Sequence, residues 1–442
     1  MTVMTTAPAP IDTSHYFTTD PHAEARSLSD TALGLTGSEI LKIASEIRAL
    51  VAAGQDVCNL TVGDFNPQQF PIPVKLRDAT IQALQAGQTN YPPADGMPEL
   101  RRAVVAMYER MLGLHYPIEC VTIVSGARPA LYATYAALLN PGETVVYPVP
   151  SWNNNHYTHL TGAHAIEVST HPEDGFLPTA AQLAPHMEQA RLIALNTPLN
   201  PTGTVIGREE LERICDLILA ENRRRDVAGE RSLFLLYDHI YWMLTFGTAR
   251  HYTPPEINPA MAAYTIFVDG ISKAFAATGV RVGWAVAPPH IAARMRDLVG
   301  HLGAWAPRAE QLGSAQLLDD PAAIQAYHQT MLPGVQQRLD TLYNGIMAMQ
   351  DAGLPVDAIP PQGAIYLSAR FELIGKTLNG VTLRSNEDIR RYLLERAGFA
   401  VVPFGAFGLK DESGWMRLSV GAASPQQIEA ALPRVRRALE GS

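Results

Sequence analysis

The sequence predicts an α/β protein whose strands form one mostly parallel sheet. Three observations support this fold class. In the middle of the 442-residue chain, short apolar segments of strand length alternate with helical segments. The apolar segments end at Gly, Pro, Asp or Asn, which favour turns. Several are apolar throughout, such as residues 233–237, and this pattern is typical of strands buried on both faces of a parallel sheet.

The expected elements follow in order along the chain. Residues 1–30 contain three prolines and lack hydrophobic periodicity, so we expect a poorly packed N-terminal arm. Ser38 can cap a helix whose apolar residues recur at helical spacing, and Gly54 can end that helix. Seven strands should follow, at residues 121–124, 144–147, 165–168, 192–195, 233–237, 265–268 and 282–286. We expect one seven-stranded sheet with helices between the strands.

Two domains are expected beyond the arm. Residues 71–320, which contain the strands, should form a large domain. The last part of the chain opens with a long helical pattern and then mixes shorter strands and helices. Residues 31–70 and 321–442 should therefore form a smaller α+β domain together. A helix expected at residues 208–225 ends in the charged run Asn222-Arg223-Arg224-Arg225-Asp226, which we interpret as a solvated helix end.

Composition excludes several classes of function. The formal net charge of −9 leaves no basic face of the kind that nucleic acid or an anionic membrane requires. No apolar run is long enough to span a membrane, and the first residues lack the basic and apolar regions of a secretory signal. The three cysteines form no CxxC pair, and no histidine cluster has metal-ligand spacing. We expect a cytoplasmic protein that acts on small molecules.

Polar residues at the carboxyl ends of the strands are the first candidates for function, because ligands of open parallel sheets bind there. The turn at residues 125–131, Ser-Gly-Ala-Arg-Pro-Ala-Leu, follows the first strand and opens a helix. Its small residues allow backbone N–H groups to approach a phosphate, although a glycine at such a turn is more often structural. Residues 196–204, Asn-Thr-Pro-Leu-Asn-Pro-Thr-Gly-Thr, follow another strand and can be ordinary turn chemistry.

Three charged residues occupy unusual positions for their type. Asp238 ends the apolar run at residues 233–237, where a carboxylate must be paired, take up a proton or cap a helix. Lys273 follows the strand at residues 265–268, where burial or a nearby cation can lower the pKa of its amine, as imine chemistry needs. Arg417 lies inside an apolar, strand-like run and needs an anion, either a ligand carboxylate or a structural ion-pair partner. Taken alone, a lysine is more often a solvated surface residue.

In this combination and order, the sequence resembles the class I and II aminotransferases, enzymes of fold type I that use pyridoxal 5'-phosphate (PLP). The resemblance runs from about residue 36 to the C-terminus. Its most specific stretch is Ser-Lys-Ala-Phe-Ala-Ala-Thr-Gly-Val-Arg-Val-Gly at residues 272–283. Further matches are Asn-Tyr-Pro-Pro-Ala-Asp-Gly at residues 90–96, Leu100-Arg101, and Pro-Ser-Trp-Asn-Asn at residues 150–154.

The resemblance implies a role for each matching residue at the cofactor ring. Lys273 would hold PLP as a Schiff base and then move a proton between the substrate's Cα and the cofactor. Asp238 would pair with the protonated pyridine nitrogen and keep the ring electron-withdrawing. Asn200 and Tyr241 would bind the phenolic oxygen, and Trp152 would stack on the ring.

The remaining matches imply a homodimer with shared active sites. The phosphate would lie among Ala127, Arg128, Ser272 and Arg281, with Tyr91 supplied by the neighbouring subunit. Arg417 would bind the α-carboxylate of an L-amino acid, and Gly63 would lie close to it. Trp152 and Asn200 would also face the substrate. The enzyme would transfer the amino group to a 2-oxo acid.

Two positions depart from the family pattern. Gly270, three residues before Lys273, replaces a phosphate-binding Ser or Thr of many relatives. The turn at residues 125–131 is one residue longer than is common, and it carries Arg128. In some aspartate-using relatives, a lysine in this turn meets the distal carboxylate of the substrate. We therefore expect Arg128 to contact that carboxylate and to favour acidic substrates.

Other functions remain open at this point. The same scaffold and lysine serve PLP-dependent lyases, synthases, decarboxylases and oxidases, which the sequence separates poorly from aminotransferases. A PLP-binding regulator would need a fused DNA-binding module, and the chain has no basic helix-turn-helix segment. A dinucleotide-binding dehydrogenase would need a Gly-x-Gly-x-x-Gly motif after an early strand, and this motif is absent. Transamination is favoured because the residues expected at the cofactor ring and at the α-carboxylate are all present.

Overall fold

The computed structural model describes residues 10–17, 20, 22–37 and 39–441 of the chain. The chain divides into two compact units, Met1–Gly37 and Ser38–Ser442. The described residues of the first unit form three short helices, η1 (Ser14–Tyr16), α1 (Ala23–Ser27) and α2 (Asp30–Leu33). Most of their side chains are exposed. The domain boundaries that the sequence predicts after residues 30, 70 and 320 remain predictions.

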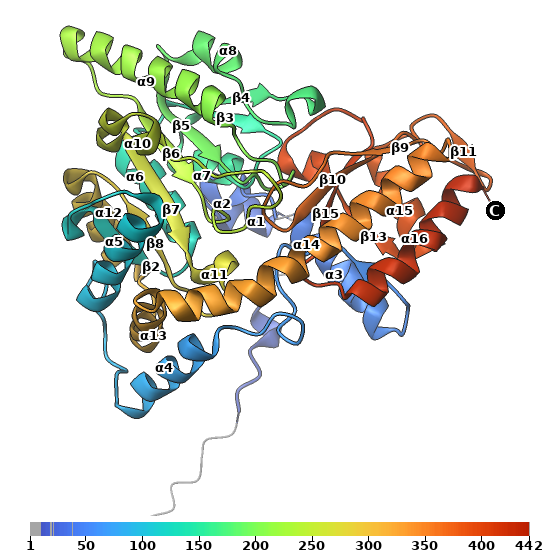
Figure 1. The fold of residues 1–442 in the computed structure, drawn as a ribbon, viewed down its shortest axis with the longest axis horizontal. Coiled ribbons are helices and arrows are strands. Elements are labelled where there is room, and N and C mark those ends of the chain that lie inside the picture. Colours follow the sequence, from blue (N-terminus) through green and yellow to red (C-terminus); the bar gives the residue numbers. More distant parts are fainter. Residues whose placement is uncertain (1–9, 18–19, 21, 38, 442) are drawn as a thin grey trace, which may run out of the picture. The chain divides into compact units, whose positions relative to one another are not determined.

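The second unit is built around a seven-stranded sheet with the strand order β2-β8-β7-β6-β5-β3-β4 (Figure 1). The strands are β2 (Val121–Val124), β3 (Thr144–Val149), β4 (His164–Ser169), β5 (Ala190–Asn196), β6 (Phe234–Asp238), β7 (Thr265–Gly270) and β8 (Gly283–Val286). All seven predicted strands are confirmed, with ends that differ by one or two residues at most. Neighbouring strands are parallel, except that β8 runs antiparallel to both β2 and β7.

Helices bury both faces of this sheet. Along β6, Leu235 and Tyr237 pack into a core with α4 (Val74–Gln85), α5 (Pro98–Leu112), α9 (Arg208–Ala228) and α13 (Arg308–Leu318). The alternate residues Phe234 and Leu236 pack into a separate core with α6 (Ala127–Leu138), α7 (Asn154–Thr161) and α12 (Pro289–Leu302). Because successive strand side chains point to opposite faces, burial on both faces explains why β6 is apolar throughout.

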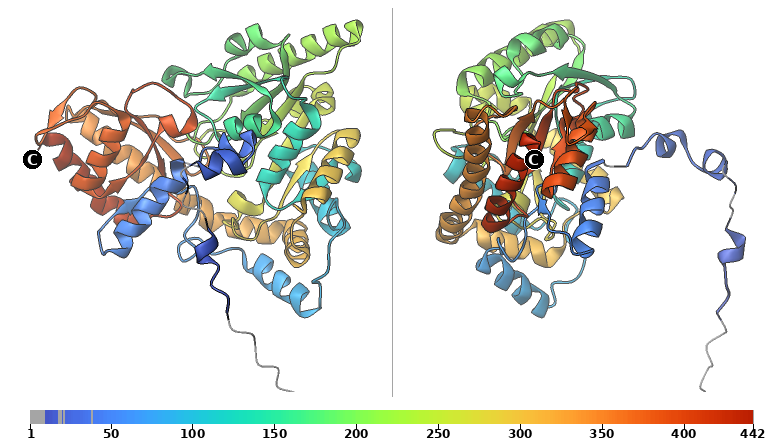
Figure 2. Two further views of the ribbon diagram at one scale, coloured as in Figure 1. Left: turned by 180° about the vertical axis from the view of Figure 1, so that it is seen from behind. Right: turned by 90° about the vertical axis from the view of Figure 1, so that its right-hand side faces the viewer.

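A third core surrounds a four-stranded antiparallel sheet with the order β14-β15-β10-β9. Its elements are β9 (Val356–Ala358), β10 (Tyr366–Phe371), β14 (Val402–Pro403), β15 (Trp415–Ser419), α14 (Pro321–Asp351), α15 (Asn386–Ala397) and α16 (Pro425–Glu440). Helix α14 runs from the large sheet to this core (Figure 2, orange), since Ile324 packs in the first core and Leu339 in the third. The helical pattern expected in this region is confirmed.

The chain enters the third core through helix α3 (Glu39–Ala52) and the short strand β1 (Cys58–Asn59). The helix expected to end near Gly54 is confirmed, while its predicted cap, Ser38, lies outside the described residues. Strand β1 pairs in parallel with β13 (Phe399–Ala400). The next carbonyl, that of Leu60, accepts a hydrogen bond from the backbone N–H of Ser419 at 2.8 Å. The loop after β1 is thereby fixed beside β15.

Shorter elements complete the second unit. They are α8 (Ala180–Leu183), α10 (Pro254–Ile257), α11 (Ile271–Ala274), β11 (Thr377–Leu378), β12 (Val381–Thr382), η2 (Ile118–Cys120), η3 (Pro172–Asp174), η4 (Ala184–His186), η5 (Pro259–Ala263) and η6 (Phe404–Phe407). Of these, α11 matters most for function because it follows β7 at the carboxyl edge of the large sheet.

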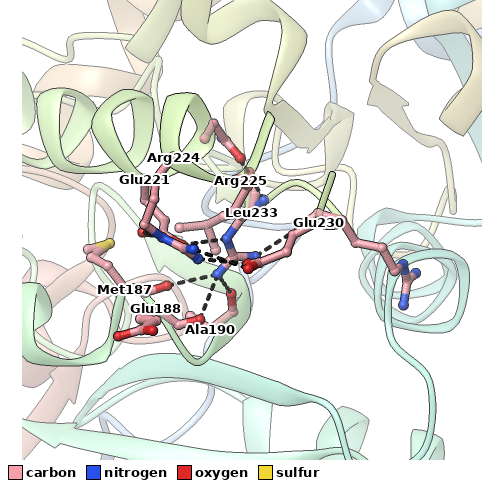
Figure 3. Close-up of polar contacts among 10 residues, drawn as sticks. Met187, Glu188, Ala190, Glu221, Arg224, Arg225, Glu230 and Leu233 are labelled. Atoms are coloured by element: carbon pink, nitrogen blue, oxygen red, sulfur yellow. Dashed lines mark hydrogen bonds and ion pairs between the residues drawn. The ribbon is translucent and has the colours of Figure 1, made fainter. Parts of the chain in front are cut away.

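The charged run at the end of α9 is not a solvated helix end as a whole, so that interpretation is wrong. Arg223 and Arg224 are exposed, but Asn222 and Arg225 are buried. Nε of Arg225 donates a hydrogen bond to Oε1 of Glu221 at 2.6 Å. Figure 3 shows that its guanidinium also donates to the backbone carbonyls of Met187, Glu188 and Ala190, at 2.7–3.0 Å. The run therefore ties α9 to the start of β5.

Candidate active site

A cavity of about 480 Å³ lies at the carboxyl ends of the parallel strands. Eleven of the predicted site residues line it: Gly63, Ala127, Arg128, Trp152, Asn200, Asp238, Tyr241, Ser272, Lys273, Arg281 and Arg417. They come from segments more than 350 positions apart along the chain, and the two sheets bring them together. Tyr91, the remaining predicted residue, does not belong to this lining. The roles predicted for these residues remain to be tested.

Lys273 lies on α11, directly after β7. Its Nζ donates a hydrogen bond to the carbonyl oxygen of Gly63 at 2.5 Å and lies 5.8 Å from the ring centroid of Tyr241. The pKa of the lysine amine is lowered to about 8, chiefly by burial and also by the positive charges of Arg417 and Arg128, against the opposing charge of Asp64. Unlike a solvated surface lysine, this amine is substantially neutral in mildly alkaline solution and can act as a nucleophile.

Asp238 ends β6, as the sequence indicated. Burial raises the pKa of its carboxyl to about 7, while the backbone N–H of Ile240, which donates to Oδ1 at 3.2 Å, and the positive charge of Lys273 oppose that rise. A turn at residues 240–243 follows the strand, so the alternative of a helix N-cap is wrong. A carboxylate with so little solvation calls for a cationic hydrogen-bond partner in the cavity.

Arg417 is almost fully buried in β15, with 1% of its surface exposed. One terminal nitrogen donates to Oδ1 of Asn200 at 3.1 Å and the other to the carbonyl of Thr61 at 2.5 Å. Its guanidinium carbon lies 4.8 Å from the ring centroids of both Tyr366 and Phe407. Within the described residues, Nε has no hydrogen-bond partner and the side chain has no carboxylate partner. The structural ion pair is therefore wrong, and a ligand carboxylate is the natural partner.

The turn between β2 and α6 forms the end of the cavity suited to an anion. Gly126 has a φ of 76°, and α6 begins at Ala127, so the first backbone N–H groups of the helix are free of intrahelical partners. Arg281 covers this turn, donating to the carbonyls of Thr278 at 2.6 Å and Ser125 at 3.1 Å. Its own φ is 62°, an unfavourable conformation for arginine that is typical of functional sites.

Close packing against the neighbouring strand requires a glycine at position 270. A Cβ atom there would lie 2.8 Å from both the Cα of Gly283 and the carbonyl oxygen of Val282 on the neighbouring strand. No side chain fits without moving β8. The absence of the family's Ser or Thr at this position therefore has a steric cause. Ser272, two positions later, contributes a hydroxyl to the cavity wall.

Trp152 and Arg128 lie together on one side of the cavity. The guanidinium carbon of Arg128 lies 5.3 Å from the ring centroid of Trp152, a cation–π geometry. Arg128 sits in the first turn of α6, and no ion pair of this side chain occurs among the described residues. Because the Arg128 guanidinium has no ion-pair partner among the described residues, it is available to an anionic ligand.

Tyr91 lies on the surface of the second unit. Its side chain is 82% exposed and meets Trp305 edge to face, with ring centroids 5.6 Å apart. Nη1 of Arg308 lies 3.4 Å from the carbonyl oxygen of Tyr91. This residue does not reach the cavity of its own chain, as expected if it serves a neighbouring subunit.

Among the other residues that line the cavity, four have polar side chains that the sequence interpretation did not assign to the site, namely Asp64, Asn196, Thr278 and Tyr366. Oη of Tyr366 lies 2.6 Å from Oη of Tyr241. A Cβ atom at Gly63 would lie 2.6 Å from Oη of Tyr366. Asp64 could have been found, since it is a carboxylate just after a short strand. Tyr366 carries no such signal, because tyrosine is common in core strands.

A larger cavity of about 800 Å³ lies on the other side of α3. Its charged residues largely pair with one another; Arg390, for example, contacts Glu46 at 3.1 Å and Glu387 at 2.7 Å. We assign the active site to the smaller cavity, because the lysine, the recessed carboxylate and the unpaired arginine nitrogen converge there. Over the described part of the chain, no group of His, Cys, Asp or Glu is arranged to hold a metal ion.

The chemistry of the cavity fits PLP. The carboxyl of Asp238 needs a cation, which a protonated pyridine nitrogen supplies. The helix N-terminus and Arg281 suit a phosphate, and Lys273 has the low pKa that a covalent bond to an aldehyde needs. The cavity therefore contains hydrogen-bond donors and acceptors that fit this cofactor.

Relatives with named activities resemble this chain over most of its length. An aspartate aminotransferase of Geobacillus stearothermophilus is 30% identical over 415 residues, which cover 93% of this chain and 99% of that protein. An aspartate/prephenate aminotransferase of Cereibacter sphaeroides is 31% identical, and the match covers 91% of this chain and 96% of that protein.

Solved structures agree with the fold. The aspartate aminotransferase from Rhizobium meliloti superposes with a TM-score of 0.83 at 28% identity, covering 93% of this chain and 98% of that chain. The Thermus thermophilus enzyme with maleate gives a TM-score of 0.82 at 28% identity, covering 94% and 100%. The predicted fold type I architecture is thus confirmed.

Within the described residues, no helix is long and apolar enough to cross a membrane. A family model described as "Aminotransferase class I and II" matches residues 55–435. Together with the curated relatives and the solved structures, this match confirms the predicted transferase activity on an amino acid and a 2-oxo acid. The chain belongs to the class I and II aminotransferases, a family of PLP-dependent enzymes.

Proposed function

We propose that Lys273 both carries the cofactor and moves the substrate's proton in this aminotransferase, and that the enzyme prefers acidic amino acids. The observation that carries the first part is a lysine amine with a pKa of about 8 in the same cavity wall as Asp238 and Arg417. When bound, PLP withdraws electrons from the substrate's Cα and so makes its proton removable. The neutral amine of Lys273 takes that proton from the substrate's Cα and delivers it to a carbon of the cofactor.

The other residues of the site orient the reactants around this lysine. Arg417 binds the α-carboxylate with its guanidinium, and it also holds the amide of Asn200 toward the cavity. Asp238 holds the proton at the pyridine nitrogen. Tyr241 donates its hydroxyl to the phenolic oxygen, and Trp152 covers the ring face. Together they exclude water and fix Cα beside the lysine.

The phosphate anchors the cofactor at the other end of the cavity. The first backbone N–H groups of α6, at Ala127 and Arg128, point toward an anion placed at the helix N-terminus. Arg281 and Ser272 supply a charged donor and a hydroxyl donor beside it. The positive φ of Gly126 lets the chain turn tightly enough for this approach.

The preference for acidic substrates rests on Arg128. Its guanidinium faces the cavity over Trp152 without a carboxylate partner among the described residues. A substrate with a second carboxylate can pair with it, whereas a neutral amino acid leaves it unpaired. Two relatives bear the names aspartate aminotransferase and aspartate/prephenate aminotransferase, and a solved relative contains maleate, a dicarboxylate.

Arg128→Ala tests this preference. We expect the ratio of kcat/KM for aspartate to kcat/KM for alanine to fall by about 10- to 100-fold, as for loss of one charge-assisted hydrogen bond. The 2-oxo acid released from each amino acid, with 2-oxoglutarate as acceptor, provides the measurement. Arg294→Ala, which removes an exposed arginine on α12, is the matched control. An unchanged ratio in Arg128→Ala, or ammonia instead of amino transfer in the parent enzyme, would contradict the proposal.

We further propose that the enzyme is a cytoplasmic homodimer in which Tyr91 of each subunit enters the active site of the other. Tyr91 is 82% exposed and packs edge to face on the half-buried Trp305, so a second copy could cover this aromatic pair. In such a dimer, the hydroxyl of Tyr91 would donate to the phosphate in the partner's site. The three cysteines are all free and buried, which fits a reducing compartment.

A further inference from the structure

The active-site cavity contains one carboxylate that the roles proposed above leave without a function. Two carboxylates, Asp64 and Asp238, line the cavity, and Asp238 is assigned to the pyridine nitrogen. Four cationic side chains line it as well, namely Arg128, Lys273, Arg281 and Arg417. Charges in a recessed cavity are weakly screened, so a carboxylate among them affects their protonation.

The loop after β1 places Asp64 next to the reactive lysine. The carbonyl oxygen of the preceding residue, Gly63, accepts the hydrogen bond from Nζ of Lys273 at 2.5 Å. Oδ1 of Asp64 accepts a hydrogen bond from Oγ1 of Thr278 at 2.5 Å and another from the backbone N–H of Phe65 at 2.8 Å. These two bonds fix the direction of the carboxylate, and Thr278 lies only five positions beyond the lysine.

Several elements bring charged or titratable groups to Lys273. Arg128 on α6, Arg281 after α11 and Arg417 on β15 each disfavour its protonated form, whereas Asp64 favours it. Asp238 at the end of β6 interacts with Lys273 as well, and the ring of Tyr241 lies 5.8 Å from Nζ. Asp64 also favours the charged form of Arg281. Because Asp238 is assigned to the pyridine nitrogen, Asp64 is the other lining carboxylate whose negative charge can oppose the effect of the arginines on the protonation of Lys273.

We propose that Asp64 is a positioning residue whose negative charge balances the positive charge of the Lys273 nitrogen, and that Thr278 holds its carboxylate in place. The inference rests on the proposed function of Lys273, because that nitrogen must alternate between protonated and neutral forms while it moves the substrate's proton. A fixed negative charge beside it sets the pH at which the alternation occurs.

A pH titration of the visible absorbance of the holoenzyme tests the inference, because the band reports whether the cofactor-bound lysine nitrogen is protonated. In Asp64→Asn, which keeps the size of the side chain but removes its charge, we expect the apparent pKa to fall by about one unit. Thr278→Val keeps the charge but frees the carboxylate, so a smaller fall in the same direction is expected. Asp297→Asn, which removes a half-exposed carboxylate on α12, should leave the titration unchanged.

The outcomes separate this inference from the proposal on which it rests. A parent enzyme that gains no visible band with PLP, or a Lys273→Ala variant that retains it, would defeat the proposed role of Lys273. A normal parent band with the same apparent pKa in Asp64→Asn would defeat only the role of Asp64. If Asp64→Asn does not fold, Thr278→Val decides the matter, since an unchanged or raised pKa in that variant contradicts the inference.

Discussion

At the scale of single residues, the reactivity of the site depends on two groups whose charges are disfavoured by burial. The pKa of the Lys273 amine is lowered to about 8, and the pKa of the Asp238 carboxyl is raised to about 7. Burial is the largest cause in both cases, because water cannot solvate the charged forms. A bound pyridinium would favour the charged form of Asp238, so the carboxyl is suited to this cofactor.

The pH dependence of cofactor binding should follow the neutral form of Lys273. Only the neutral amine attacks an aldehyde, so the rate at which cofactor-free protein gains its visible band should rise about tenfold per pH unit below pH 8 and level off above it. Stopped-flow absorbance at a series of pH values gives this profile. A rate that continues to rise to the ordinary lysine pKa of 10.5 would contradict the lowered value.

At the scale of elements, the strands position the chemistry and the helix ends stabilise the strands. The carboxyl ends of β2, β5, β6 and β7 lead into the residues that line the cavity. At the opposite end of the sheet, a buried ion pair within α9 joins Arg225 to Glu221, whose side chains are 5% and 9% exposed. The Arg225 guanidinium also satisfies the carbonyls that precede β5 (Figure 3).

Removal of this arginine should affect stability without affecting catalysis. Arg225→Ala removes the donor of the backbone carbonyls of Met187, Glu188, Ala190 and Arg231 and leaves Glu221 paired with Arg224 alone. The free energy of unfolding should therefore fall by about 3–5 kcal/mol. Arg223→Ala, two positions away on the exposed side of α9, should change it by no more than about 0.5 kcal/mol. Urea unfolding measures both variants, and kcat/KM should match the parent in each. Equal stability of the two variants would show that the buried contacts contribute nothing.

At the scale of the whole molecule, the candidate site needs both sheets and, by our proposal, a second subunit. Arg417 belongs to the four-stranded sheet, whereas Asp238 ends one strand of the seven-stranded sheet and Lys273 follows another. Tyr91 is exposed on its own chain and lies outside its cavity. In the dimer that we propose, the tyrosine of each subunit would complete the site of the other.

Hybrid dimers provide a test of this sharing. Lys273→Ala and Tyr91→Ala should each be severely impaired, but a hybrid of the two contains one site with both changes and one with neither. Unfolding and refolding an equal mixture should therefore restore about a quarter of the parent activity. Lys273→Ala mixed with Asp238→Asn is the control, because both residues serve the same chain's cavity and no intact site forms. If the first mixture recovers no more activity than the control, Tyr91 does not cross between subunits.

Sequence alone determined the large sheet and most of the site. The strands are short and apolar on both faces, so their residues are recognisable without knowing their neighbours, and polar residues at their ends mark the ligand edge. Asp238 and Arg417 were found in this way, since each ends or interrupts an apolar run, whereas Lys273 was identified by its resemblance to the family motif. The physical reason is local, because the cost of burying a charge is visible in the residues on either side of it.

Only the tertiary structure decided which charges face one another. Asp64 and Thr278 are 214 positions apart, and their hydrogen bond depends on how the loop after β1 passes over α11. The buried Arg225 lies beside the exposed Arg224, and sequence cannot separate them because helix rotation against the sheet selects one. Gly270 departs from the family pattern for a reason found only in its neighbour across the sheet, Gly283. Contacts between distant segments set these features, and residue type and spacing do not contain that information.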